Sequence, residues 1–412
     1  MLSQFEPIQV CMQNIFALIL LAIFSFACPP VKAGKGIYQA KKRKCKKKKR
    51  NKCKDNEDFE PLSKLSVSPL DLENGNLTYI VPLGNLNPSG HTFPTRHTYW
   101  HLPREVDGDF STPSARVDVR APGDITIDRI EDNVITDEIT IYSIKFSLSK
   151  EVKAYFLHVT SLADKLQSAF DSKKQCSNGR CDANNLDLAA SAGEVIGTAG
   201  GDMYNNQLDM GMVDHRNKKM LFANKSRWLH DDTHSHYQYI VCPLDYFEDG
   251  LKETLYTYLG NYSEPRTIEP ICGKVNFYEK NSIAGIWYKP KTSSTYPEDP
   301  HLALGIDNID PNFGKFSIGT HASNAGIDVG TYYFNPENTG LVNRTFVDVK
   351  DNDIYCYEVN PGTFGPSIDT SQNISFLLQL KKNGKLKLDL NPQTNCGTGP
   401  WDISDSAPEY ER

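Results

Sequence analysis

The sequence predicts a mainly β protein with two β-rich domains, and three observations support this prediction. The chain has 412 residues, which is long enough for two domains with separate cores. A hydrophobic fraction of 39%, with 20 tyrosines and 19 phenylalanines, is typical of a globular protein. Thr, Ile and Val are plentiful, and Gly or Pro recurs roughly every ten residues, which favours short strands and turns over long helices.

The amino-terminal 33 residues are predicted to be a secretory signal peptide. Residues 15–27 are an apolar run that is too short for a membrane span, which needs about 20 residues. Ala33 offers a small residue at a cleavage point. However, Glu6 and no Lys or Arg precede the run. A true start at Met12 and an uncleaved anchor are therefore alternatives, and the protein is expected to be secreted or held at the cell surface.

Residues 34–59 form a basic segment that is expected to be disordered. From Lys41 to Lys54, 11 of 14 residues are Lys or Arg, and without them 34 basic residues face 51 acidic ones. Such a block repels itself and cannot bury apolar surface. One interpretation is a solvated linker or a pro-segment cut after Arg50. The other is an arm that binds anionic polymers or anionic lipid. Nucleic acid is not expected as a partner, because nuclear targeting contradicts a signal peptide.

The cysteines favour disulfides. Ten cysteines become eight after signal cleavage, and an even number in a secreted chain indicates paired thiols. Among 105 arrangements, the proposed pairs are Cys45 with Cys53, Cys176 with Cys181, Cys242 with Cys272, and Cys356 with Cys396. No Cys-x-x-Cys pair occurs, which argues against a cysteine zinc site. In a eukaryotic source, five Asn-x-Ser/Thr sequons would be glycan acceptors, at Asn76, Asn224, Asn261, Asn343 and Asn373.

The first domain, residues 60–268, is predicted to consist of strands with little helix. Segments rich in β-branched and aromatic residues predict strands at residues 77–83, 91–102, 115–120, 124–130, 139–147, 153–160, 207–214 and 237–241. Residues 139–147 and 153–160 are expected to pair as a hairpin. Short helices are predicted at residues 162–170 and 245–255, a loop at 182–188, and a turn at 194–201.

The strand predicted at residues 207–214 has two different faces. Apolar residues from Leu208 to Met212 occupy every second position, and they alternate with Gln207, Asp209 and Gly211. Because side chains alternate across a strand, one face is predicted to enter the core. The other face is available for a site.

Four segments, taken in chain order, resemble motifs of lysostaphin-type (LytM-like) zinc endopeptidases. They are Val119-Arg-Ala121-Pro122, Phe156-Leu-His158-Val159, Gly193-Glu-Val-Ile196-Gly197 and Gln207-Leu-Asp209-Met-Gly211. The family carries Val-x-Ala-Pro, Tyr-x-His-Leu, Gly-x-x-Ile-Gly and His-Leu-His-Phe-Glu in these places. The resemblance implies that the first domain has the family's duplicated hybrid motif, with a groove open along a sheet.

This chain departs from the family at the residues that hold and serve the metal. A catalytic zinc ion needs three protein ligands and an open position for water. The resemblance implies a catalytic role for His158, but Gln207 stands at a degenerate catalytic position, since an amide exchanges no useful proton near neutral pH. Asp209 replaces the last zinc-binding His. The family's His-x-Gly-x-Asp motif has no faithful counterpart, and its nearest candidates are His91 and His97.

Other histidines have weaker patterns. His230, His234 and His236 are closely spaced and could hold a metal on a loop, or they could lie in a solvated turn before the strand at 237–241. His101 and His215 are isolated and are expected to be structural.

The second domain, residues 269–400, is predicted to be an antiparallel β barrel or sandwich, followed by a tail at 401–412. Nine strands are expected, at residues 273–278, 285–289, 302–307, 315–320, 327–334, 344–349, 353–359, 374–380 and 386–390. Asn383-Gly384 indicates a hairpin turn. Gly285-Ile-Trp287 resembles the Gly-x-Trp opening of lipocalins, so a ligand-binding barrel is an alternative to a generic β accessory module.

The expected function follows from the altered peptidase motifs. The sequence lacks a phosphate-binding Gly-x-x-x-x-Gly-Lys-Ser/Thr loop, His-Glu-x-x-His and Gly-x-Ser-x-Gly, whereas a paired-carboxylate glycosidase stays open. The first hypothesis is a catalytically impaired groove that binds a glycan or a peptide-crosslinked, cell-wall-like polymer, with Tyr99 and Trp100 available for stacking. The second is an active zinc metalloendopeptidase using His91 or His97, His158 and Asp209. The third is binding of anionic polymer through the lysine-rich arm.

Overall fold

The computed structural model describes residues 62–106, 109, 111–136, 139–203, 205–228, 235–293, 295–362 and 374–412. All of these residues belong to one unit, residues 58–412. The protein is mainly β, as predicted, with 40% of the described residues in strands and 11% in helices. The predicted signal peptide, the lysine-rich segment and Asn373 lie outside the described residues.

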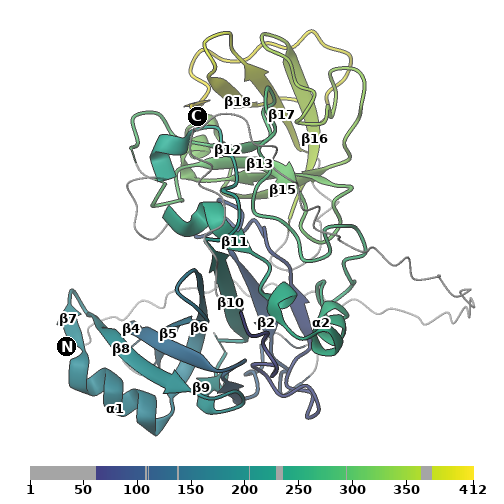
Figure 1. Ribbon diagram of the computed structural model, residues 1–412. Coiled ribbons are helices and arrows are strands. Elements are labelled where there is room, and N and C mark those ends of the chain that lie inside the picture. The colour runs from purple at the N-terminus through teal and green to yellow at the C-terminus, as the bar shows by residue number, and fades with distance from the viewer. Residues whose placement is uncertain are drawn as a thin grey trace, which may run out of the picture. The chain divides into compact units, whose positions relative to one another are not determined.

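The first half of the unit is an antiparallel sheet (Figure 1). Its main path runs β1-β2-β10-β6-β5-β4-β8-β7, while β11 pairs with β10, and β9 joins β3 to β6. The strands are β1 (Tyr79–Val81), β2 (His97–His101), β3 (Val117–Arg120), β4 (Ile125–Thr136), β5 (Ile139–Ser147), β6 (Val152–Leu162), β7 (Gln175–Ser177), β8 (Arg180–Ala190), β9 (Val195–Ala199), β10 (Gln207–Asp214) and β11 (Ile240–Val241).

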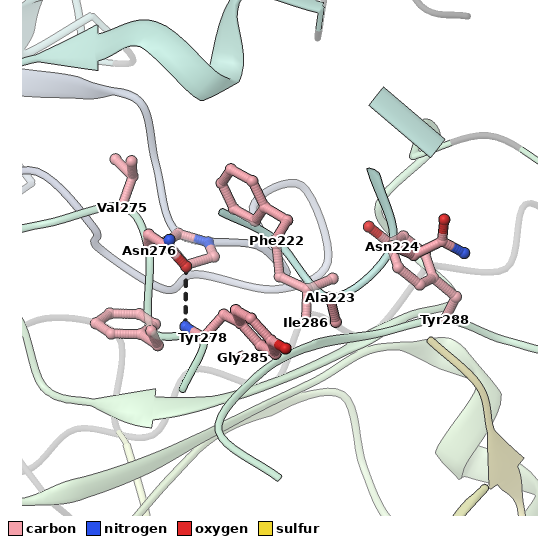
Figure 2. Close-up of a pocket in the computed structure, with 11 residues that line it drawn as sticks. Phe222, Ala223, Asn224, Val275, Asn276, Tyr278, Gly285, Ile286 and Tyr288 are labelled. Carbon is pink, nitrogen blue, oxygen red and sulfur yellow. Dashed lines mark hydrogen bonds between the residues drawn. The ribbon is translucent and has the colours of Figure 1, made fainter. Parts of the chain in front are cut away.

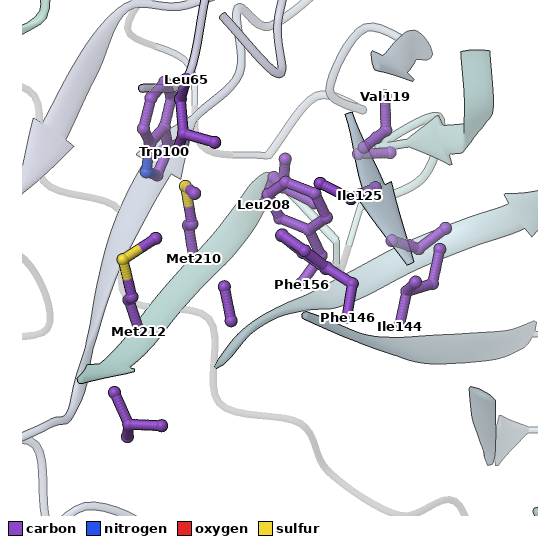
Figure 3. Close-up of a cluster of buried hydrophobic side chains, with 14 of the residues drawn as sticks. Leu65, Trp100, Val119, Ile125, Ile144, Phe146, Phe156, Leu208, Met210 and Met212 are labelled. Atoms are coloured by element: carbon purple, nitrogen blue, oxygen red, sulfur yellow. The ribbon is translucent and has the colours of Figure 1, made fainter. Parts of the chain in front are cut away.

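The core of this sheet is built from alternate residues of its central strands. Leu208, Met210 and Met212 of β10 are fully buried and point into a cluster that contains Trp100 and Phe156 (Figure 3). The predicted apolar face of β10 is therefore confirmed. Burial of each such side chain contributes about 1.5–3 kcal/mol to stability.

Helices cover little of the sheet. α1 (Asp164–Lys173) packs against β8 and β6 and buries Leu166 and Phe170. α2 (Asp249–Tyr256) follows η3 (Pro243–Tyr246), so the one helix predicted at residues 245–255 is divided into two short elements. The 3-10 turns η1 (Lys225–Trp228) and η2 (Ser235–Tyr239) precede β11. Residues 237–241 were predicted as a strand, but only Ile240–Val241 is extended.

The predicted loop at residues 182–188 was wrong, because these residues lie within β8. Their polar sequence hides a strand whose Ala183, Leu186 and Ala190 are buried. Asn185 and Asp187 adopt positive φ angles of 54° and 50°, and the register against β4 shifts at this place. Residues 182–184 and 188–190 pair with β4, and Asn185 and Asp187 adopt the left-handed conformation that Asn and Asp tolerate in the irregular stretch between them. The predicted turn at 194–201 likewise contains a strand, β9.

The second half of the unit is a nearly closed antiparallel barrel. Each strand pairs with the next in chain order: β12 (Gly285–Trp287), β13 (Leu302–Ile306), β14 (Gly314–Ile318), β15 (Gly330–Phe334), β16 (Ile354–Pro361), β17 (Ile374–Leu380), β18 (Leu386–Leu390) and β19 (Glu409–Tyr410). Tyr288 and Glu411 then exchange two backbone hydrogen bonds of 2.8 and 2.9 Å. These bonds join the first strand to the last, as in up-and-down barrels.

The barrel differs from the prediction at three places. Residues 273–278 and 344–349 form no strand, whereas residues 401–412, expected to be a tail, hold β19. η4 (Thr320–Ala325) follows β14 and ends at Gly326, whose φ of 73° suits glycine. β19 is only two residues long, which explains why its sequence carries no alternation signal.

Aromatic side chains fill the barrel interior. Phe316 contacts the rings of Phe334, Phe346 and Phe376 at centroid distances of 5.0–5.7 Å. The Arg412 guanidinium lies 4.2 Å from the Trp287 ring centroid. These packed rings occupy the space in which a ligand-binding barrel would hold its ligand.

Three of the proposed disulfides are confirmed: Cys176–Cys181, Cys242–Cys272 and Cys356–Cys396. Cys45 and Cys53 lie outside the described residues. Paired cysteines indicate an oxidising environment. Among the residues the structure describes, no helix has both the length and the apolar character needed to cross a membrane.

Candidate functional site

The face of β10 opposite the core is covered by polar side chains of neighbouring strands. Asp209 pairs with Tyr99 of β2, and Gly211 pairs with His97. Residues directly opposite each other on paired strands share a face of the sheet. The side chains of His97 and Asp209 therefore meet on the face that the β10 alternation leaves for a site.

The structure brings the candidate ligands together on this face. Nε2 of His97 lies 3.3 Å from Oδ2 of Asp209, and Nε2 of His158 lies 3.4 Å from the same oxygen. The His91 ring meets the His97 ring edge-on, with centroids 5.6 Å apart. Gln207 donates from Nε2 to Oδ1 of Asp209 over 3.0 Å. One carboxylate thus lies between two imidazoles and an amide.

His158 reaches the site through a distortion of β6. Its φ of 64° is rare for a residue with a side chain. The register of β6 against β5 shifts between Phe156 and Val159, so His158 lies within the irregularity. Such a bulge re-aims a side chain, and bulges are frequent beside functional sites. The imidazole of His158 is 32% exposed, so solvent or a ligand can reach it.

A second layer of residues holds His158 in place. Nδ1 of His158 lies 3.3 Å from Oδ1 of Asn205. Asn205 in turn donates to the Asp202 carboxylate from its backbone N at 2.7 Å and from Nδ2 at 2.8 Å. No sequence pattern indicates this support, because Asn205 and Asp202 belong to the loop before β10 and resemble ordinary turn residues.

Tyr155 braces the other end of the site. Its ring lies across Gly211, where a Cβ atom would collide with the phenol. The Tyr155 hydroxyl donates to the carbonyl of Arg96 over 3.4 Å, next to His97. Burial raises the pKa of Tyr155 to about 12, so the phenol stays neutral. Gly211 is therefore needed for close packing, which is a role that a single sequence cannot reveal.

Burial controls the charges of the group. It raises the pKa of Asp209 to about 6, against the opposing effects of His158 and of the Gln207 hydrogen bond. It lowers the pKa of His91 to about 4, helped by Arg96, and it lowers the pKa of His97 well below the usual value. At neutral pH, His91 and His97 are therefore neutral imidazoles beside an ionised carboxylate.

His97 is the least satisfied member of the group. Its side chain is buried, yet neither ring nitrogen makes a hydrogen bond in the described parts of the chain. Nε2 approaches Asp209 without the geometry of a hydrogen bond. A buried polar group without a partner costs about 1–3 kcal/mol, so this ring has the character of a ligand whose partner is a metal or another bound group.

The fit to zinc is partial. Two ligands at about 2.0–2.1 Å from a tetrahedral zinc ion lie about 3.3 Å apart, which matches the spacing of His97 and His158 from Oδ2 of Asp209. Across the described ranges, however, no group of three or more His, Cys, Asp or Glu side chains stands so that it could hold a metal ion. Binding of an ion would therefore require the rings to reorient.

The aromatic residues proposed for stacking were wrongly chosen. Trp100 is fully buried and donates from Nε1 to Oγ1 of Thr98 at 2.9 Å, and Tyr99 is only 7% exposed. A different set borders the site: Tyr79 stacks on His101 at 4.3 Å between centroids, with Tyr262 edge-on to Tyr79. His101 lies opposite Gln207 in the sheet.

The second predicted histidine group is described only in part. His230 and His234 fall outside the described residues, and Nδ1 of His236 lies 3.1 Å from Nε2 of His215. The metal-binding loop thus stays a prediction.

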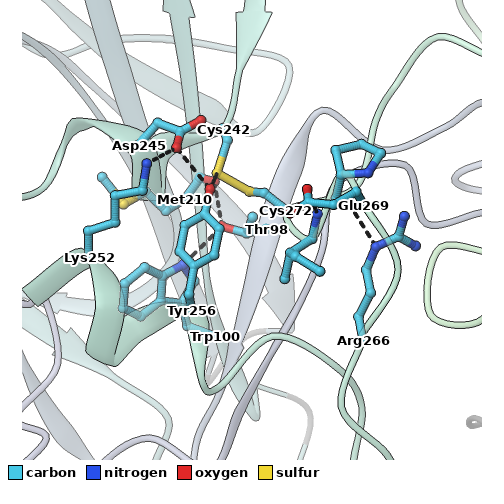
Figure 4. The surroundings of a disulfide bond; sticks show 12 residues. Thr98, Trp100, Met210, Cys242, Asp245, Lys252, Tyr256, Arg266, Glu269 and Cys272 are labelled. Atoms are coloured by element: carbon cyan, nitrogen blue, oxygen red, sulfur yellow. Dashed lines mark hydrogen bonds and ion pairs between the residues drawn. A yellow bond between two sulfur atoms is a disulfide. The ribbon is translucent and has the colours of Figure 1, made fainter. Parts of the chain in front are cut away.

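Two cavities occur away from the polar face. A cavity of about 10 Å³, large enough for one water, lies between the segments around Phe222 and Ile286 (Figure 2). A groove of about 490 Å³ runs beside the Cys242–Cys272 disulfide, where the Asp245 carboxylate accepts from Lys252 and from the Tyr256 hydroxyl (Figure 4).

Comparison with known proteins gives no relative. No family model, no curated protein and no solved structure matches the chain.

Proposed function

We propose that this protein is secreted or surface-bound and binds a glycan or a peptide-crosslinked, cell-wall-like polymer on the polar face of β2, β10 and β6. The disulfides and the resemblance to lysostaphin-like peptidases support this proposal. An extended polymer suits a site that lies along strands, because consecutive units can contact consecutive rows of side chains. The proposal takes the face to be a former peptidase site that retains binding.

The observation that carries the proposal is the bond between Gln207 and Asp209. The resemblance puts a proton-carrying His at position 207, and an amide cannot take its place in acid–base chemistry. The Gln207 amide also already has a partner within the protein, because its Nε2 donates a hydrogen bond to Oδ1 of Asp209. His158 remains as an accessible polar group that can hydrogen-bond a hydroxyl or a peptide amide.

A second function, zinc-dependent cleavage of peptide crosslinks, is favoured by His97. Its buried and unbonded ring nitrogens would be satisfied by a metal, and His91 and Asp209 are the further candidate ligands. Bound zinc would supply Lewis-acid activation of water and of the scissile carbonyl. The chain's own contribution would be His158, held by Asn205 to exchange a proton with the substrate.

Sedimentation with insoluble peptidoglycan sacculi tests the binding function. The full chain should co-sediment with sacculi. The single substitutions His158→Ala and Asp209→Asn should each weaken binding by about tenfold or more. Asp118→Asn, an exposed residue of β3, is the matched control and should bind as the native protein does. Equal binding by all four proteins would remove this face from the function.

A further inference from the structure

The segment that carries His91 and His97 is anchored by the barrel. Phe93 lies between the two histidines and is 1% exposed. Its ring is stacked parallel on His301, with 5.3 Å between centroids, and stands edge-on to Tyr288 at 5.6 Å. Tyr288 directly follows β12 and His301 directly precedes β13, so both belong to the barrel.

A carboxylate from the barrel also binds the backbone of this segment. Oε2 of Glu298 accepts a hydrogen bond from the backbone N of Phe93 at 2.9 Å. Glu298 is itself tied to the barrel, because its carbonyl accepts from the backbone N of His301 at 3.0 Å. The carbonyl of His301 then accepts from Gly319, immediately after β14.

The opposite side of the segment is held by the first half of the unit. The Tyr237 hydroxyl donates to the carbonyl of Pro94. Thr95 donates from its backbone N to Asn85, and its carbonyl accepts from Gly84, both at 2.9 Å. Residues 93–95 are therefore held by contacts from both halves of the unit. His91 precedes this held stretch and His97 follows it.

We propose that Glu298 is a positioning residue for the site, and that the barrel completes the site by fixing His91 and His97 through Phe93. This inference rests on the proposed function in that it assigns the barrel a role in the same site. The ring contacts of Phe93 hold the segment by apolar packing. Glu298 fixes the position of its backbone through one hydrogen bond from the Phe93 N–H. Loss of that bond leaves a buried N–H unsatisfied and frees the segment to shift.

The experiment compares Glu298→Ala with Glu298→Gln in the full chain. The Gln side chain keeps an oxygen that can accept from Phe93, so it should restore what the Ala variant loses. Asn308→Ala is the matched control: Nδ2 of this buried residue, which follows β13, donates to the carbonyl of Pro82 at 3.1 Å, so the variant removes a bond between the two halves but leaves the Glu298–Phe93 bond in place. Histidine ring signals from selectively ¹⁵N-labelled protein and co-sedimentation with sacculi are the two readouts.

Glu298→Ala should move the ring signals of His91 and His97 and weaken sacculus binding about tenfold, while Glu298→Gln and Asn308→Ala stay close to native. Native ring signals in Glu298→Ala would overturn the proposal, as would failure of Glu298→Gln to restore them. If Glu298→Ala does not fold, Glu298→Asp, with its shorter reach, takes its place under the same criteria. If the native protein does not bind sacculi, the proposed function fails, and the ring signals still decide the role of Glu298.

Discussion

Gln207 donates a hydrogen bond from Nε2 to Oδ1 of Asp209, so the two residues that interrupt the peptidase-like motif are bonded to each other. They lie two positions apart on β10, where side chains share a face. The amide thus satisfies one oxygen of the buried carboxylate, and the other oxygen faces His97 and His158. This arrangement stabilises an ionised carboxylate without requiring a bound ion.

Gln207→Ala should raise the pKa of Asp209 further above about 6, because the lost hydrogen bond favours the ionised form. A hydrogen bond to a charged group is worth about 1.5–3 kcal/mol, which corresponds to about one pKa unit or more. Carboxyl ¹³C NMR titration of chelator-treated protein measures the change. Gln167→Ala breaks an equivalent Gln–Asp bond on exposed α1 and should leave Asp209 unaffected. An unchanged Asp209 titration in Gln207→Ala would contradict the assigned bond.

Glu298 should make the protein less stable as pH rises. Burial raises its pKa from 4.5 to about 7, against the opposing effects of the Phe93 hydrogen bond and of Arg96. Between these two pH values the folded state holds a proton that the unfolded state has released, so the free energy of unfolding falls with rising pH. The loss begins near pH 4.5, is complete above pH 7 and amounts to about 3 kcal/mol at most.

Glu298→Gln removes this titration. Urea denaturation at pH 4.5 and pH 8 measures the resulting change in the free energy of unfolding. The stability of the Gln variant relative to the native protein should increase by up to about 3 kcal/mol between these conditions. Glu279→Gln, at an exposed glutamate, should show no such increase. A parallel pH dependence of Glu298→Gln and native protein would refute the raised pKa.

Gly211→Ala should disturb the site by steric collision. A methyl group at this position would strike the Tyr155 ring, which braces the residue before His97. Overpacking of this kind costs about 1–3 kcal/mol, and displacement of Tyr155 should alter the ring signals of His97. Gly250→Ala meets open space on α2 and should be neutral or stabilising by up to about 1 kcal/mol. Thermal unfolding measures both, and equal stability of the two variants would contradict the packing.

The sequence predicted the features that depend on local patterns. The alternation of Leu208, Met210 and Met212 identified the buried face of β10. The short loop between Cys176 and Cys181 indicated their disulfide. The peptidase resemblance selected His158 and Asp209 as candidate site residues, and their role stays a prediction, although Nε2 of His158 lies 3.4 Å from Oδ2 of Asp209.

The features that the sequence did not predict depend on contacts between distant segments. β8 is a strand because it pairs with β4, although Asn185 and Asp187 favour turns. Tyr99 and Trp100 were predicted to be available for a ligand, but Trp100 enters the hydrophobic core and Tyr99 is buried on the other face of the sheet. Glu298 approaches Phe93 from 205 residues further along the chain, and no spacing rule relates the two.

A zinc site on this face would have a defined signature. Chelator-treated protein should take up one equivalent of Zn²⁺ with tighter binding at pH 7 than at pH 4, because Asp209, with a pKa of about 6, must be ionised, and His91, with a pKa of about 4, must be neutral. Isothermal titration should show loss of this uptake in His97→Ala and Asp209→Asn. His321→Gln, at a half-buried histidine whose Nε2 contacts the carbonyl of Glu409 in the barrel, is the control and should bind as the native protein does. If the native protein takes up no zinc but still binds sacculi, the metallopeptidase function is excluded and the polymer-binding function is retained. One equivalent of zinc lost in both variants would reverse that choice, since the unbonded nitrogens of His97 would then have their partner.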